Sequence, residues 1–171
     1  MHQCKHGSRL RTRVMAAVTG LVAALTTGLV ATAPAHADAR AGFSLRSVLD
    51  TRLCLDVRGG VATAGQDMQL WDCHGGAGQR WTWQGTHLAS DLRPGLCLDV
   101  RGGVAVAGQD VQIWGCTGGA AQRWTWRGNS LVSTLRPDLC LDVRGGVGVR
   151  GQDVQIWWCN GTAGQRWEQA G

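Results

Sequence analysis

Apolar and polar residues alternate in short runs along most of this chain, and glycine-rich segments separate the runs. In residues 68–73 the alternation is strict, so Met68, Leu70 and Asp72 share one face of an extended segment, while Gln69, Trp71 and Cys73 share the other. The runs show no apolar spacing of the helical kind. This pattern predicts an all-β chain.

The alternating runs belong to a unit that occurs three times. The sequence Cys-Leu-Asp-Val-Arg-Gly-Gly begins at Cys54, Cys97 and Cys140, and a second cysteine and a Gln-Arg-Trp triplet follow in every copy. We therefore divide the chain into repeats at about 45–87, 88–130 and 131–171, with predicted strands at 45–49, 53–57 and 68–73 in the first copy. A unit of this length buries its apolar face against its neighbours, so the three repeats should share one core.

The N-terminal segment has the pattern of a secretory signal peptide. A basic run precedes the uncharged residues 14–33, and Ala35-His36-Ala37 forms a small-x-small cleavage sequence. We expect cleavage after Ala37, secretion of the mature chain 38–171 as one domain, and no membrane span after processing. The alternative is that the uncharged run stays in place as a membrane anchor.

Charge argues against a nucleic-acid partner. The formal net charge of +5 belongs largely to the predicted leader, because four of the seventeen basic residues lie there. The mature chain has thirteen arginines against twelve acidic residues, and the arginines are spread evenly over the repeats. No basic stripe therefore forms of the kind that nucleic-acid binding requires.

Six cysteines remain after processing, and they predict three disulfide bonds in a secreted chain. Six cysteines allow fifteen pairings. We favour pairing within each repeat, because only this set gives every copy the same short hairpin: Cys54 with Cys73, Cys97 with Cys116 and Cys140 with Cys159. Zinc is disfavoured because the chain has no Cys-x-x-Cys pair, and we expect neither a metal nor a cofactor.

The predicted hairpin brings a carboxylate beside an indole. If Cys54 lies opposite Cys73 in an antiparallel pair, then Asp56 lies opposite Trp71. An aromatic face stacks on the C–H face of a sugar, and a carboxylate accepts hydrogen bonds from its hydroxyls. We therefore predict three equivalent sugar-binding sites, at Asp56 with Trp71, Asp99 with Trp114 and Asp142 with Trp157. In the alternative, the indole only covers its own disulfide.

These motifs resemble a known family. The combination of Cys-Leu-Asp-Val, Gly-x-x-x-Gln-x-Trp-x-Cys and Gln-x-Trp, in three copies, is similar to the ricin-B-type lectins and the related carbohydrate-binding modules of actinobacterial glycosidases. The resemblance implies a β-trefoil of twelve strands, six closing a barrel and six capping it, with Trp81, Trp124 and Trp167 in the core. A repeat of this length also suits a WD40 blade, but three copies are too few for a propeller.

The resemblance adds candidate sugar contacts. It assigns them to the polar residue after the second cysteine and to the glutamine of Gln-x-Trp, which also ties down a loop. These residues are His74, Thr117 and Asn160, and Gln79, Gln122 and Gln165. His74 fits the family best and Thr117 least. The chain departs from the family before each glutamine, where Gly78, Ala121 and Gly164 replace the usual Asn, and each site should lose one amide.

Catalysis is disfavoured, because an acid and a base need different environments, whereas the three Asp residues occupy copies of the same one. The sequence therefore predicts a secreted, monomeric, non-catalytic domain that binds polysaccharides or glycans, with galactose and xylose as the candidate sugar types. The alternative is a β-trefoil that has lost sugar binding and acts as an inhibitor or through other protein contacts. The missing Asn favours this second hypothesis, and the three Asp-Trp pairs oppose it.

Overall fold

The computed structural model describes residues 42–171, in which each repeat contributes four β-strands and two short 3₁₀ turns. The predicted signal peptide and its cleavage site lie outside the described residues. In repeat 1 the elements are β1 Ser44–Ser47, β2 Leu53–Val57, η1 Arg58–Gly60, β3 Gln66–Asp72, η2 Ala77–Gln79 and β4 Trp81–Gln84. In repeat 2 they are β5 His87–Ser90, β6 Leu96–Val100, η3 Arg101–Gly103, β7 Val111–Gly115, η4 Ala120–Gln122 and β8 Trp124–Arg127. In repeat 3 they are β9 Ser130–Ser133, β10 Leu139–Val143, η5 Arg144–Gly146, β11 Val154–Trp158, η6 Ala163–Gln165 and β12 Trp167–Ala170.

The first and fourth strands of the repeats close a six-stranded barrel. Strand β1 pairs with β12, β4 with β5 and β8 with β9, all antiparallel. Backbone hydrogen bonds complete the ring between these hairpins, from Phe43 to Trp81, from Trp124 to Thr86 and from Trp167 to Asn129. The pairing of β1 with β12 joins the first and last strands of the domain and closes the barrel.

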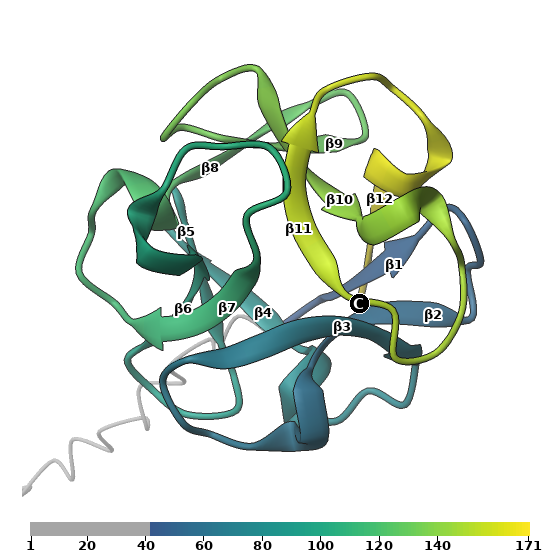
Figure 1. Cartoon of the computed structure of the whole chain (residues 1–171). Coiled ribbons are helices and arrows are strands. Elements are labelled where there is room, and N and C mark those ends of the chain that lie inside the picture. Colours follow the sequence, from purple (N-terminus) through teal and green to yellow (C-terminus); the bar gives the residue numbers. More distant parts are fainter. Residues whose placement is uncertain (1–41) are drawn as a thin grey trace, which may run out of the picture. The chain divides into compact units, whose positions relative to one another are not determined.

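The second and third strands form three hairpins that cap this barrel. The hairpins β2–β3, β6–β7 and β10–β11 are arranged around a central axis in Figure 1. Neighbouring hairpins are joined near the axis through β3 with β7 and through single bridges from Gln69 to Asp153 and from Asp110 to Gln155. The predicted all-β trefoil of twelve strands is confirmed.

The core follows the alternation in the sequence. Met68 and Leu70 are completely buried, as are Val111 and Ile113 in repeat 2. Trp81, Trp124 and Trp167, the last residues of the Gln-Arg-Trp triplets, are at most 1% exposed and are the largest side chains of the core. Their predicted place in the core is therefore confirmed, and the polar faces of the hairpins are left free to form sites.

The strand register differs from the prediction by two residues. Cys54 lies opposite Trp71, not Cys73, and Asp56 lies opposite Gln69, not Trp71. The reason is that β3 ends at Asp72, so Cys73 lies beyond the strand and its disulfide crosses the hairpin diagonally, with the two Cα atoms 5.1 Å apart. Asp56 and Trp71 still share one face, because Gln69 and Trp71 are two residues apart on one strand.

Three disulfide bonds have the predicted pairing within each repeat: Cys54 with Cys73, Cys97 with Cys116 and Cys140 with Cys159. Each ties the start of the second strand to the chain just after the third. The bridges therefore hold the hairpins that carry the candidate sites. Within residues 42–171 no helix is long and apolar enough to cross a membrane.

Candidate functional site

A carboxylate stands at the base of each candidate site. Asp56 lies on β2, is only 5% exposed, and its Oδ1 accepts a hydrogen bond of 2.9 Å from Nε2 of Gln69 on β3. Gln112 donates to Asp99 over 2.9 Å and Gln155 to Asp142 over 2.8 Å in the same way. The amide holds one carboxylate oxygen in place, and the other oxygen can accept a hydrogen bond from a ligand hydroxyl.

An exposed indole lies beside each carboxylate. Trp71, Trp114 and Trp157 are 40%, 46% and 40% exposed, although tryptophan is normally well buried. This exposure fits the prediction that these residues lie on the polar face of the hairpin. An indole face open to solvent provides a flat apolar surface for stacking.

The indole of one repeat also lies against a loop of the preceding repeat. A Cβ atom at Gly65 would lie 3.5 Å from the Trp114 ring, and a Cβ atom at Gly108 would lie 3.5 Å from the Trp157 ring. Both glycines have φ angles near +90°, which L-residues with side chains rarely adopt. The aromatic platforms of repeats 2 and 3 are therefore placed partly by their neighbours.

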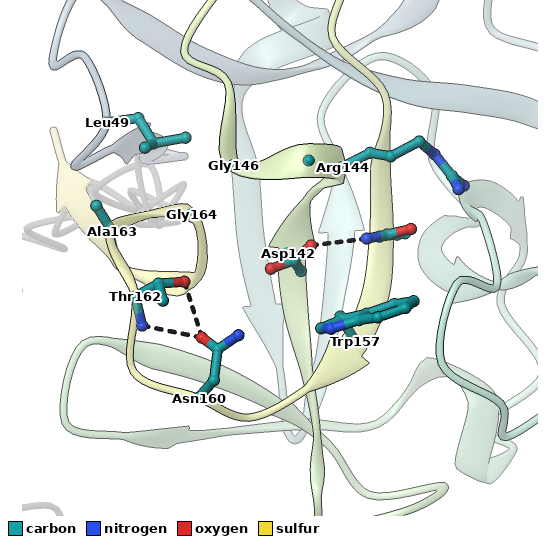
Figure 2. Close-up of a pocket in the computed structure, with 11 residues that line it drawn as sticks. Leu49, Asp142, Arg144, Gly146, Trp157, Asn160, Thr162, Ala163 and Gly164 are labelled. Atoms are coloured by element: carbon teal, nitrogen blue, oxygen red, sulfur yellow. Dashed lines mark hydrogen bonds between the residues drawn. The ribbon is translucent and has the colours of Figure 1, made fainter.

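The Asp and Trp side chains line an open pocket in each repeat. Gly59 and Gly60, both with positive φ, turn the chain directly after β2 and line the pocket with Asp56, and the equivalent glycine pairs do the same in the other repeats. The pockets of repeats 1, 2 and 3 have volumes of about 450, 490 and 730 Å³. Figure 2 shows the third pocket, with Asp142 and Trp157 on one side and Thr162 and Ala163 on the other.

The residue after the second cysteine differs between the repeats, and so does the hydrogen-bonding group that it can offer to a ligand. The His74 ring accepts the Gly76 N–H at Nδ1 over 3.0 Å, so its proton is on Nε2, which lies 3.7 Å from the Asp56 carboxylate. Oδ1 of Asn160 accepts from the N–H and hydroxyl of Thr162, which leaves the amide nitrogen free on the side of Asp142 and Trp157 (Figure 2). Thr117 donates its hydroxyl proton internally, to Gln122 over 3.2 Å.

The three Gln-x-Trp glutamines lie behind the pockets. Gln79, Gln122 and Gln165 are completely buried. Oε1 of Gln79 accepts the His74 N–H over 2.9 Å, and its Nε2 donates to the Asp72 carbonyl over 2.8 Å. With both ends of the amide bonded to the backbone, these glutamines support the loop after the second cysteine, as the resemblance implies.

The arginine that follows each Asp-Val pair links a pocket to the neighbouring repeat. Arg58, Arg101 and Arg144 line the three pockets. Each guanidinium forms an ion pair with the Asp of a Gly-Gln-Asp loop in another repeat and donates to a glycine carbonyl of that loop. The pairs are Arg58 with Asp153, Arg101 with Asp67 and Arg144 with Asp110, and they close a ring around the axis.

The sequence prediction missed these arginines and the glutamines that hold the carboxylates. Both sets recur in every copy: the arginine comes directly after Asp-Val, and the glutamine lies two residues before the exposed Trp. The repetition was visible in the sequence. A correct strand register would have placed Gln69 opposite Asp56.

Burial raises the pKa of Asp56, Asp99 and Asp142 above the ordinary value of 3.8, because a buried carboxylate loses solvation. Hydrogen bonds from neighbouring amides and the nearby arginines oppose the shift without cancelling it. A raised pKa means that the folded chain disfavours the ionised form of these groups, so the three charges reduce stability at neutral pH.

Replacing all three Asp residues by Asn should therefore raise the melting temperature at pH 7. Asn keeps the oxygen that accepts from Gln69, Gln112 or Gln155 and removes the charge. The gain should vanish near pH 3, below the raised pKa, because the wild-type carboxyls are then neutral as well. Thermal unfolding of both proteins at the two pH values tests this; an equal difference at both would contradict it.

The sequence of residues 41–167 matches the family described as ricin-type beta-trefoil lectin domain. The chain belongs to this family. The ricin-type lectin assignment and the geometry agree, because the matched region contains all three pockets and all three Gln-x-Trp tryptophans. Carbohydrate binding is the activity that the family supports.

Solved structures share this lectin fold. The designed three-fold symmetric protein ThreeFoil has a TM-score of 0.69 at 22% identity, over 75% of this chain and 97% of that one. The C-terminal half of an earthworm R-type lectin, in complex with GalNAc, has a TM-score of 0.63 at 21% identity, over 76% and 98%. The β-trefoil lectin of the Vibrio vulnificus hemolysin/cytolysin, with N-acetyl-D-lactosamine bound, has a TM-score of 0.62 at 27% identity, over 76% and 94%.

The ricin-type lectin fold also occurs as part of larger proteins. The exo-beta-1,3-galactanase 1,3Gal43A from Clostridium thermocellum matches with a TM-score of 0.66 at 22% identity. The match covers 76% of this chain but only 30% of the galactanase chain.

Proposed function

We propose that this chain is a secreted, non-catalytic domain that binds sugars on polysaccharides or glycans through three related pockets. The observation that carries the proposal is the pairing, in each repeat, of a buried carboxylate with an exposed indole at one open pocket. The carboxylate accepts hydrogen bonds from sugar hydroxyls, and the indole stacks on the C–H face of the ring. The three disulfides and the predicted leader support secretion, which the intact mass of the exported protein would test.

The absence of catalysis is supported by the similarity of the three sites. Asp56, Asp99 and Asp142 have the same amide partner, nearly the same burial and the same direction of pKa shift. A glycosidase needs two carboxyl groups with different roles near one bond. Each pocket offers a single carboxylate.

The pockets should differ in strength, because their third polar residue differs. Sites 1 and 3 each offer an N–H donor, from His74 or Asn160, whereas the Thr117 hydroxyl already donates to Gln122. One ordinary hydrogen bond contributes about 0.5 to 1.5 kcal/mol. We therefore infer that sites 1 and 3 carry most of the binding and that site 2 is the weakest.

The experiment is a glycan array and a polysaccharide pull-down with the oxidised mature domain. Binding to a defined set of glycans supports the proposal and identifies the sugar. A protein-interaction domain is the second candidate, and the specific observation in its favour is the missing amide at Gly78, Ala121 and Gly164. A folded, oxidised domain that binds no glycan in either assay would favour this second function.

Restoring the missing amide should tighten binding. A Cβ atom at Gly78 would lie 3.7 Å from the Cα of Gly60, which is an ordinary van der Waals contact, and Gly78 lines the open pocket into which a longer side chain can extend. In a background that keeps only site 1, made with Asp99→Ala and Asp142→Ala, Gly78→Asn should tighten binding by about 2- to 10-fold. Isothermal titration with the sugar found on the array measures this change.

Gly78→Ala is the matched control, because it adds the Cβ without the amide, as Ala121 does naturally in repeat 2. It should leave the affinity unchanged. If the Asn and Ala variants bind equally, position 78 does not face the sugar.

A further inference from the structure

The pocket of repeat 3 is about one and a half times as large as the other two, and its lining includes a residue from another repeat. Leu49, which follows β1 in repeat 1, lines this pocket together with Asp142, Trp157 and Asn160. Leu92 and Leu135 occupy the equivalent sequence positions, but neither lines the pocket of repeat 1 or repeat 2. Repeat 3 therefore has a space beyond the Asp-Trp pair that the other repeats lack.

A glycine in repeat 3 allows Leu49 to lie there. A Cβ atom at Gly148 would lie only 3.1 Å from the Cβ of Leu49, which is tighter than an ordinary contact. Repeats 1 and 2 have alanine at this position, Ala62 and Ala105. The backbone of Gly148 is outside the positive-φ region, so the glycine is needed for space and not for its conformation.

A second substitution places a hydroxyl in the same space. Thr162 lines the pocket of repeat 3, where repeats 1 and 2 have Gly76 and Gly119. Its hydroxyl donates to Oδ1 of Asn160 over 2.8 Å, so the lone pairs of the Thr162 oxygen can accept a hydrogen bond. Figure 2 shows Leu49, Thr162 and Ala163 on the side of the pocket that faces Asp142 and Trp157.

We propose that the pocket of repeat 3 binds two linked sugar rings, whereas the pockets of repeats 1 and 2 bind one. The first ring stacks on Trp157 and bonds to Asp142 and Asn160. The second ring packs its C–H face against Leu49 and Ala163, and one of its hydroxyls donates a hydrogen bond to the Thr162 side-chain oxygen. This inference rests on the proposed function. It predicts that repeat 3 is the site that distinguishes a disaccharide from a monosaccharide.

The test uses a protein in which only site 3 can bind, made with Asp56→Ala and Asp99→Ala. It is titrated with galactose and lactose, and with xylose, xylobiose and xylotriose. In the series that binds, the disaccharide should bind about tenfold more tightly than the monosaccharide, which is the gain from one hydrogen bond and a small apolar contact. Xylotriose should add nothing to xylobiose.

Gly148→Ala in the same background should remove the tenfold preference and leave the monosaccharide affinity unchanged, because it gives repeat 3 the alanine of the other two. Leu49→Ala should also weaken disaccharide binding, whereas Leu92→Ala is the matched control and should have no effect. Melting temperatures of all variants establish that each is folded.

The two proposals fail in different ways. Equal affinity for mono- and disaccharide, or an equal loss of both in Gly148→Ala, overturns the second subsite and leaves the sugar-binding function intact. If a folded domain with all three sites binds neither series and no glycan on the array, the proposed function is overturned and the subsite with it.

Discussion

The variant in which alanine replaces Asp56, Asp99 and Asp142 together is expected to lose binding to polysaccharide. Each pocket is shallow and open, so a single site should hold a monosaccharide only in the millimolar range, about −4 kcal/mol. Three sites on one rigid domain can engage a polymer together, and such multivalency strengthens binding by factors of about 10² to 10⁴ when the spacing fits. Removing the three carboxylates should therefore lower the apparent affinity for polymer by at least this factor.

Variants with a single substitution show how much each site contributes to the binding affinity. Asp99→Ala should have the smallest effect, because site 2 has the Thr117 hydroxyl that donates internally. Asp138→Ala is the control, since this exposed carboxylate pairs with Arg136 outside the pockets. Isothermal titration with polymer and monosaccharide separates affinity from avidity. A triple variant that binds as well as wild type would show that the Asp-Trp site is wrong, and complete loss in Asp56→Ala alone would show that only repeat 1 binds.

Reduction of the three disulfides is expected to unfold the domain under mild conditions. Each bridge joins residues 19 apart, and closing a loop of this length contributes about 3 kcal/mol in the chain-entropy model. The sum approaches the total stability of a typical domain, about 5 to 15 kcal/mol. Replacing one pair, Cys97 and Cys116, by alanine should lower the melting temperature by about 10 °C.

Circular dichroism with and without reductant measures this loss, and a digest without reductant should yield only the three peptides linked within repeats. The matched control is the variant that lacks all six cysteines, whose circular dichroism spectrum should be the same with and without the reductant. A reduced domain that keeps its melting temperature would mean that the shared core alone maintains the fold.

Most of the fold was accessible from the sequence, because the core follows the alternation. The burial of Met68 and Leu70 and the exposure of Trp71 required only the period of a strand. The register was not accessible in this way, because a disulfide can join residues that face each other directly or diagonally. The prediction assumed a direct pair and missed the contact between Asp56 and Gln69.

The site was harder to predict where it depends on contacts between repeats. Leu49 is about a hundred residues from Trp157 in the sequence, and nothing in its local pattern distinguishes it from Leu92 or Leu135. The clue was the exchange of Ala62 and Ala105 for Gly148, which has meaning only when the loop against it is known. Repetition identifies what the copies share, whereas their differences require the assembled structure.

The ring of arginine and aspartate pairs means that one side chain of every pocket is held in place by another repeat. Arg101 of repeat 2 is held by Asp67 of repeat 1, Arg144 by Asp110 of repeat 2, and Arg58 by Asp153 of repeat 3. This head-to-tail order is that of a cyclic trimer in which every subunit uses one surface to give and another to receive. A peptide of one repeat could then pair its pocket arginine only by assembling as a closed trimer, and joining the three copies in one polypeptide makes that assembly independent of concentration.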